Sequence, residues 1–338
     1  MLKQKTVLVV GAGASAEFEF PIGSGLISTI KTICSFRTDW SGVRLGNERF
    51  ANALRTFAEL NKIEEAIAFA AADSVALRLG GSHKSIDQLI HTYNDNPNFV
   101  EVAKLAIAFA ISERENSAFG SDPISAWALT AWRKDNWIDS FTANYFSGYQ
   151  KNSLEDLFSD LAIICFNYDR CVEYGFARAL AFHFNLSDLQ AIELMRQLII
   201  IHPYGDLGRL PNSRDRIDKA IRLQSSEAIV DMARHIKTFT EEQSDVALGQ
   251  QTKKVLDDAS IIVSLGFGYQ APNIKLLEAT KSRSRLFAGT TYGMSKSDAE
   301  VGPRNLMQVL NAVTNNTHSI APVKANEIIQ SLQLLLFR

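Results

Sequence analysis

Thr6–Ser15 reads TVLVVGAGAS, a β-branched apolar run that ends in a glycine turn. A continuous apolar run of this length, bounded by glycine, is typical of a strand buried on both faces of a parallel sheet. Glycines after such a strand let the chain turn sharply into a helix. The stretch therefore predicts the first βα unit of an α/β fold.

Further short apolar runs follow late in the chain, and each precedes a loop that contains Gly, Asn or Thr. They are LAIICF at 161–166, LIIIH at 198–202, IIVSL at 261–265 and RLFAG at 285–289, and a last strand is expected near 318–320. Helical patterns separate these runs. Strands that alternate with helices predict a doubly wound, Rossmann-like parallel sheet.

Between the first and second predicted strands, the sequence is mostly helical in pattern. Apolar positions at spacings of three and four recur over 48–79, which predicts one long helix or two short ones, and the same pattern returns over 86–93, 99–112 and about 124–149. We find no internal repeat and no low-complexity linker in the chain. We therefore expect a single α/β domain over 1–338, with a large helical insertion after the first strand at about 45–155.

The composition is that of an ordered chain with nearly balanced charge. Of 338 residues, 46% are hydrophobic, and 35 Lys and Arg stand against 37 Asp and Glu, a net charge of -2. A duplex-binding domain usually carries a basic surplus, so no direct nucleic-acid binding is expected. No apolar stretch reaches the ~18 residues of a membrane span, and no export signal is recognised, so we expect no membrane association and a cytoplasmic location.

The cysteines exclude several classes of site. Only Cys34, Cys165 and Cys171 occur, without CxxC spacing. A disulfide scaffold and a four-cysteine zinc site are therefore not expected. The sequence also lacks HExxH, GxxxxGK[ST] and GxSxG motifs, which removes support for metalloprotease, P-loop and serine hydrolase chemistry. We expect no metal.

The glycine turn matches a dinucleotide-binding pattern. GAGASA at 11–16 fits G-x-G-x-x-A, although tight βα turns also use glycine for purely steric reasons. A dehydrogenase would place an acid at the end of a second strand about twenty residues later, to bind the ribose hydroxyls. Asp39 lies in that region but follows no convincing strand, so hydride transfer is disfavoured.

Further motifs follow the glycine turn in a distinctive order. They are FPIGSGL at 20–26, FNYD at 166–169, HPYGDLG at 202–208 and SLGFGYQAPN at 264–273. In an open parallel sheet the strand ends converge on one crevice. Over residues 7 to about 295 this series resembles the sirtuin-like NAD-binding family. The helical block is unmatched except for SID at 85–87, which resembles a motif of the prokaryotic branch of that family. The resemblance implies that the single α/β domain is sirtuin-like.

Two departures separate the chain from the protein deacylases of that family. Deacylases carry a zinc ribbon with four cysteines, which this chain lacks, and they have an N-I-D core and an Asp-Phe-Arg segment where this chain has FNYD and FPIGSG. Both departures favour the prokaryotic branch, whose members resemble NAD hydrolases of anti-phage (antiviral) defence. The resemblance implies a homo-oligomer and a partner such as a HerA-type ring translocase, which is an ATPase, or an Argonaute-type protein.

Three polar residues are the candidate catalytic groups. Asn167 can orient water or a ribose hydroxyl, because its amide both donates and accepts, and the resemblance makes it catalytic. His202 can act as a general base near neutral pH, whereas a lone histidine after a strand is often a satisfied core residue. Asp169 can hold the nicotinamide amide or the ribose, or it can cap the helix from Arg170 onward.

The two glycine-containing loops are expected to hold the rest of NAD. Ser15 and the amides of Ala12–Ser15 are candidates for the pyrophosphate, although a serine N-cap would use the same amides. Gly266 and Gly268 would let a second loop approach the adenosine half.

The remaining candidates each have a structural alternative. Thr290 can reach the adenine ribose or close a strand-end turn, and Asp87 can line the nicotinamide side or serve as a helix-start acid. Asn273 is expected to cap the helix that follows Pro272. The cofactor-binding candidates are Gly11, Ala12, Gly13, Ser15, Pro21, Ile22, Asp87, Gly205, Gly266, Gly268, Asn273 and Thr290.

Together these features predict an NAD+ glycohydrolase (NADase), with NAD as the substrate. It would cleave the nicotinamide N-glycosidic bond to give nicotinamide and ADP-ribose, and it would deplete NAD when activated in a defence complex. Two alternatives use the same pocket: a non-catalytic scaffold subunit that binds NAD or ADP-ribose, and an ADP-ribosyltransferase.

Overall fold

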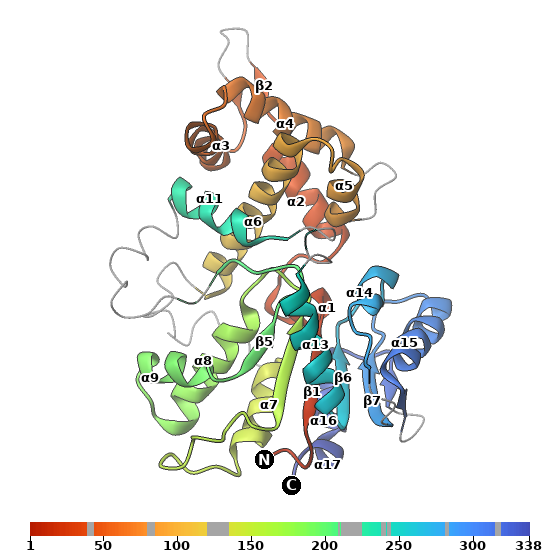
Figure 1. Ribbon diagram of the computed structural model, residues 1–338. Helices are drawn as coiled ribbons and strands as arrows, with labels where there is room; N and C mark the ends of the chain where they lie inside the picture. Colours follow the sequence, from red (N-terminus) through yellow and green to blue (C-terminus); the bar gives the residue numbers. More distant parts are fainter. Residues whose placement is uncertain are drawn as a thin grey trace. The chain divides into compact units, whose positions relative to one another are not determined.

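The computed structural model describes residues 1–38, 44–79, 85–119, 135–208, 210, 225–237, 241, 245–280, 284–314 and 319–338. The chain divides into two compact units, labelled by element in Figure 1, and we describe each by itself. Unit 1 comprises Met1–Glu19, Trp132–Pro203 and Gln243–Arg338, and unit 2 comprises Phe20–Ala131 and Tyr204–Glu242. The expected insertion at about 45–155 thus overlaps unit 2 only up to residue 131, and unit 2 also takes in 204–242.

Unit 1 is built on a parallel sheet. Its strands are β1 (Thr6–Val10), β4 (Leu161–Cys165), β5 (Ile199–Ile201), β6 (Ile261–Leu265), β7 (Arg285–Thr290), β8 (Ala312–Val313) and β9 (Ile320–Ala321). Within the described residues these seven strands lie in the order β5-β4-β1-β6-β7-β8, with β9 beside β7, and all their pairings are parallel. Counted along the chain, this is the Rossmann order 3-2-1-4-5-6. The predicted α/β fold with a Rossmann-like parallel sheet is confirmed.

The central strands end at one level. Val10 of β1 pairs with Cys165 of β4 on one side and with Leu265 of β6 on the other. Every residue of these three strands is buried, as continuous β-branched runs predict. The loops that follow therefore begin side by side at the carboxyl edge of the sheet. Between β1 and β6 the strand order reverses, and open α/β sheets bind their ligands at this kind of position.

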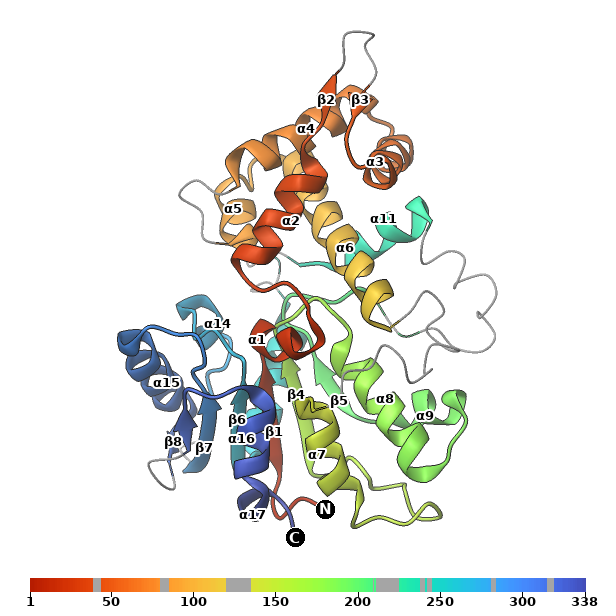
Figure 2. The same cartoon turned by 180° about the vertical axis from the view of Figure 1, so that it is seen from behind.

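Helices cover both faces of the sheet. The helices of unit 1 are α1 (Ala12–Ser15), the 3-10 turn η1 (Ala16–Phe18), α7 (Trp137–Phe146), α8 (Cys171–Phe184), α9 (Asp188–Met195), α13 (Val246–Asp258), α14 (Ala271–Lys275), α15 (Lys296–Leu310), α16 (Ala325–Ser331) and α17 (Gln333–Leu336). α13 lies in front of the sheet in Figure 1, whereas α7 and α16 lie in front of it in the reverse view of Figure 2. This two-sided cover is what keeps a fully apolar parallel sheet out of water.

Unit 2 is mostly helical. It contains α2 (Ser24–Cys34), the short strands β2 (Arg37–Thr38) and β3 (Arg44–Leu45), α3 (Glu48–Asn61), α4 (Glu65–Arg78), α5 (Ile86–Thr92), α6 (Pro97–Phe119) and α11 (Ser226–His235). α6 is buried along most of its length and packs against α2, α3, α4, α5 and α11. A helix that is apolar all round is expected at the centre of such a bundle. In the part of the chain that is described, no helix combines the length and apolarity needed to span a bilayer.

Some element boundaries differ from the sequence expectation. The pattern over 48–79, which is compatible with one long helix or two short ones, forms two helices, because Lys62 adopts a left-handed conformation at the end of α3. β8 has no counterpart in the sequence prediction, since a strand of two residues carries no periodic signal. The helical pattern expected over about 124–149 begins outside the described residues, which resume at residue 135. Within its described part, α7 begins at Trp137.

Candidate functional site

The loops after β1 and β6 meet through their backbones, and we call Gly11, Gly13 and Gly266 the glycine contact. The N–H of Gly11 donates to the carbonyl of Leu265 at 2.9 Å, and the N–H of Gly13 donates to the carbonyl of Gly266 at 3.0 Å. Gly266 has φ +57°, and a Cβ there would lie 2.0 Å from the nitrogen of Ala14. Only glycine fits this position without displacing the neighbouring loop.

This contact limits which amides face a ligand. The N–H of Gly13 is engaged by Gly266, and the N–H of Ala14 donates to the carbonyl of Gly11 at 2.9 Å. Two of the amides expected at a pyrophosphate therefore already donate within the loops. The steric function of the glycines is evident, and phosphate binding by Ala12 and Ser15 stays a prediction.

Side chains from different strand ends form a hydrogen-bonded group, which we call the polar network: Ser15, Asn167, Asp169, Glu173 and His202. Asn167 Nδ2 donates to Ser15 Oγ at 2.8 Å, and Ser15 Oγ donates to Asp169 Oδ1 at 3.0 Å. All three side chains are buried. The network joins the end of β1 to the loop after β4, as the register of the two strands allows.

The structure bears on one interpretation of Asp169, its contact with a helix start, while binding of the nicotinamide amide or the ribose stays a prediction. Its Oδ1 accepts the N–H of Cys171, the first residue of α8, at 3.1 Å, so the carboxylate does satisfy a free amide at a helix start. The same oxygen accepts the Ser15 hydroxyl. Ser15, in contrast, makes no side-chain cap, and its hydroxyl is committed to the polar network.

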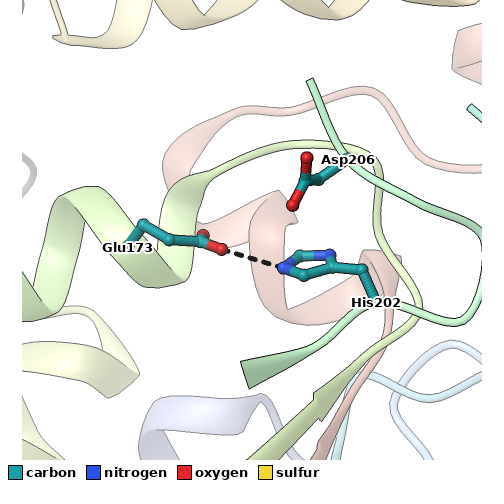
Figure 3. Close-up of side chains that lie close together, drawn as sticks. All are labelled: Glu173, His202 and Asp206. Atoms are coloured by element: carbon teal, nitrogen blue, oxygen red, sulfur yellow. Dashed lines mark hydrogen bonds and ion pairs between the residues drawn. The ribbon is translucent and has the colours of Figure 1, made fainter. Parts of the chain in front are cut away.

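His202 follows β5 and joins the network through both ring nitrogens. Ile201 pairs with Ile164, which brings the next residue, His202, level with Cys165 on β4. The ring lies 3.1 Å from the carbonyl oxygen of Asn167 through Nδ1, and 2.8 Å from Glu173 Oε1 through Nε2. Figure 3 shows the second of these contacts; Asp206, also labelled there, belongs to unit 2.

The surroundings of His202 alter its acidity. Burial opposes protonation of the ring, but the Cys165 sulfur and the Glu173 carboxylate favour it, and together they raise the pKa of His202 well above its ordinary value. Burial raises the pKa of the Cys165 thiol, so Cys165 is neutral at physiological pH. Glu173 is the carboxyl group in direct contact with the ring, through Nε2.

The loop after β6 is held by hydroxyl groups. The N–H of Gly266 donates to Thr290 Oγ1 at 2.8 Å, and Ser264 Oγ lies 2.6 Å from the Tyr269 hydroxyl. Tyr269 also donates to the carbonyl of Thr290 at 3.2 Å, and burial raises its pKa. Thr290 thus closes the strand end through its side chain, while adenine-ribose binding by this residue stays a prediction.

Two candidates in the same loop have contrasting positions. Gly268 is exposed, and a Cβ there would meet only the Gln270 side chain at 3.9 Å, so open space lies beside it. The expectation that Asn273 caps a helix after Pro272 is wrong. α14 already begins at Ala271 with Gln270 as its N-cap, because proline fits the first turn of a helix, and Asn273 lies inside it.

Four cofactor-binding candidates lie in unit 2: Pro21, Ile22, Asp87 and Gly205. Ile22 is exposed, and Asp87 occupies the first turn of α5, which fits its alternative interpretation as a helix-start acid. Gly205 has φ +74°, and a Cβ there would lie 1.9 Å from the carbonyl oxygen of His235, so packing alone requires glycine. The structure places these four in a different unit from the remaining candidates.

Sequence reasoning missed two members of the site region, Glu173 and Tyr269. Glu173 stands in the first turn of α8, where an acid is ordinarily explained by the helix dipole. Tyr269 adopts φ +51°, which sequence patterns do not signal. Only the strand register brings Glu173 to His202 and places the Tyr269 hydroxyl against Ser264.

The polar network has the groups that a hydrolytic site needs. It offers an amide, a carboxylate and an imidazole within one buried hydrogen-bonded series at the carboxyl edge of a parallel sheet. Asn167 uses its amide nitrogen inside the network, and among the described residues its Oδ1 has no hydrogen-bond partner. This oxygen can therefore accept from a water molecule or a sugar hydroxyl.

Comparisons with known proteins add no assignment. No family model matches the chain, and no curated protein matches its sequence. The Rossmann strand order, the glycine contact and the polar network are the observations that bear on function.

Proposed function

We propose that this chain is an NAD+ hydrolase that releases nicotinamide and ADP-ribose. The observation that carries the proposal is the hydrogen-bonded series of Ser15, Asn167, Asp169 and His202 at the carboxyl ends of β1, β4 and β5. The reversal of strand order beside it is where Rossmann sheets bind nucleotides. The order of motifs that resembles sirtuin-like NAD-binding proteins supports the same substrate.

The chemistry assigns a task to each group. The bond between the ribose anomeric carbon and the nicotinamide nitrogen breaks, and its electron pair leaves with nicotinamide, which departs neutral. Asn167 Oδ1 orients the attacking water or a ribose hydroxyl, and neutral His202 takes the proton that the water loses as it bonds to the anomeric carbon. Asp169 holds the hydroxyl of Ser15 and stabilises the positive charge that develops on the sugar.

The wider biological setting is also a proposal. Uncontrolled loss of NAD would harm the cell, so we propose that a partner restrains or activates the enzyme, in keeping with an anti-phage effector. A homo-oligomer in complex with a HerA-type ring ATPase or an Argonaute-type protein fits the resemblance, and a cytoplasmic location fits the substrate.

The direct test is to incubate the purified chain, alone and with candidate partners, with NAD and to measure nicotinamide and ADP-ribose. We expect turnover that falls at least about 100-fold in Asn167→Ala and in His202→Ala, because each variant removes a positioned polar group. His183→Ala is the matched control, since His183 lies exposed on α8 and should leave turnover unchanged.

The other outcomes separate the alternatives. Tight NAD binding without turnover in any assembly would contradict hydrolysis and favour the scaffold. With NAD labelled in its adenosine half, label retained on a macromolecule would favour ADP-ribosyl transfer instead.

A further inference from the structure

The contact between Glu173 and His202 is the part of the polar network that the proposed reaction does not explain. Glu173 Oε1 lies 2.8 Å from Nε2 of His202, and the two side chains are only 13% and 6% exposed (Figure 3). Glu173 stands one helical turn beyond Asp169 and two residues beyond Cys171, whose amide Asp169 accepts. Both carboxyl groups of the network are therefore positioned at the start of α8.

The geometry determines how many protons His202 carries. Nδ1 faces a backbone carbonyl at 3.1 Å, and Nε2 faces a carboxylate at 2.8 Å. Both partners can only accept, so both ring nitrogens must donate. With Glu173 ionised, the ring is therefore an imidazolium, and a buried charge of this kind persists only because an opposite charge lies against it.

The titratable groups around the ring agree with this conclusion. Within unit 1 they are the Cys165 thiol on β4 and the Glu173 carboxylate on α8, and both contribute to the raised pKa of His202. Asp206, which follows in the chain after β5, belongs to unit 2. Among the described residues of unit 1, Glu173 supplies the carboxyl group that contacts the ring.

We propose that Glu173 is a positioning residue for His202: it fixes the ring between the Asn167 carbonyl and its own carboxylate, and it holds the resting ring in the protonated form. The proposal rests on the hydrolase function above and goes beyond it. Before it can act as a base, His202 must release a proton to solvent and turn the freed ring nitrogen from its protein partner toward the attacking water, because Nδ1 and Nε2 both face protein acceptors here. When it takes the proton of the attacking water, it returns to the imidazolium paired with Glu173.

The pH dependence follows with a definite sign. A base must be neutral to accept a proton, so kcat/KM should rise with pH through the raised pKa of His202. Glu173→Gln keeps the size of the side chain but removes its charge, which lowers that pKa. In Glu173→Gln, the rising limb of the kcat/KM profile should therefore move to lower pH. The kcat of this variant at the high-pH plateau should fall at least about tenfold, because the ring of His202 is less firmly oriented. KM should change little, since Glu173 is not placed against the substrate.

Two measurements test the proposal independently. The first is the pH profile of NAD turnover for the wild-type chain and for Glu173→Gln, with Glu193→Gln as the matched control. Glu193 is an exposed residue of α9 that pairs with Arg196, so its variant should reproduce the wild-type profile. The second is NMR titration of the histidine-labelled chain, with the His202 signal assigned from His202→Gln.

The NMR result is expected to show a His202 pKa above the ordinary histidine value that falls in Glu173→Gln. An ordinary value that the substitution leaves unchanged would overturn the proposal, as would an unshifted pH profile in an active variant. If the titration shifts as expected while no assembly turns over NAD, the hydrolase function fails and the positioning of His202 by Glu173 stands.

A second variant guards against misfolding. Glu173→Asp keeps the charge on a shorter side chain, so it should hold the His202 pKa above that of Glu173→Gln and recover part of kcat. Thermal unfolding of each variant identifies any that does not fold. If Glu173→Asp folds and its His202 pKa matches that of Glu173→Gln, the carboxylate charge is not what sets the protonation, and the proposal is contradicted.

Discussion

The glycine contact and the polar network lie at the same edge of one sheet but are held together in different ways. Gly11, Gly13 and Gly266 meet through backbone atoms, and any added Cβ would collide with the facing loop. The polar network is joined by side-chain hydrogen bonds and includes the buried contact of Glu173 with His202, which is an ion pair when the ring is protonated. The first depends on shape alone, whereas the second depends on protonation.

Within the candidate site, the glycine contact therefore supports the fold, and the polar network supplies the chemical groups. Backbone packing sets how closely the loops after β1 and β6 approach, and it has no titratable group of its own. The network then uses this fixed frame to place an amide, a carboxylate and an imidazole. Substitutions in the glycine contact should therefore reduce stability, and substitutions in the network should reduce activity more than stability.

The largest effect is expected from Gly266→Ala. The new Cβ would lie 2.0 Å from the nitrogen of Ala14, and φ +57° is unfavourable for alanine. Overpacking and left-handed strain together should lower the free energy of unfolding by about 3 kcal/mol or more, measured by urea denaturation.

Gly293→Ala is the matched control for that prediction. Gly293 also has a positive φ, +74°, but no atom lies within 4 Å of the point where its Cβ would stand. Gly293→Ala should lower the free energy of unfolding by only about 1–2 kcal/mol, the strain of a left-handed alanine. If Gly266→Ala lowers the free energy of unfolding no more than Gly293→Ala does, the loops after β1 and β6 do not approach each other as closely as described.

A smaller effect is expected from Tyr269→Phe. The substitution leaves the buried hydroxyl of Ser264 without its partner and removes one donor from the Thr290 carbonyl. The free energy of unfolding should fall by about 1–2 kcal/mol in urea denaturation. Tyr292→Phe, at an exposed tyrosine, should be neutral; equal losses in the two variants would show that the hydroxyl pairing does not support this loop.

The smallest stability effect is expected from Ser15→Ala. The variant loses a donor to Asp169 and an acceptor for Asn167, which should cost about 1 kcal/mol in urea denaturation. NAD turnover should fall by a larger factor than stability alone explains, because Asn167 and Asp169 lose their shared partner. Ser147→Ala, at an exposed serine, should change neither quantity, and an active Ser15→Ala would remove Ser15 from the catalytic arrangement.

The sequence predicted the main strands well because their signal is local. The runs that form β1, β4 and β6 are continuous and apolar, and each is fully buried. The motifs after these strands are expected to converge, and Ser15, Asn167, Asp169 and His202 do lie in one hydrogen-bonded group. Convergence follows from parallel strands that end at one level.

Other features depend on contacts that the sequence does not signal. Asn273, expected at a helix cap, lies inside α14, because the helix begins before the proline. Pro21, Ile22, Asp87 and Gly205 share the motif series with the other candidates, but they belong to unit 2. A motif order describes the chain, whereas membership of a compact unit depends on which segments pack together.

By itself, the sequence determined the apolar strands, the glycine turns and the identities of the groups at the strand ends, since each is a property of a few neighbouring residues. The tertiary structure alone decided which amides of the glycine turn are already occupied, and that Glu173 rather than a more distant acid is paired with His202. Those outcomes depend on strand register and on the start of α8, which bring together residues that are far apart in the sequence. Because acidity follows from such contacts, the raised pKa of His202 is a property of the fold and not of its motif.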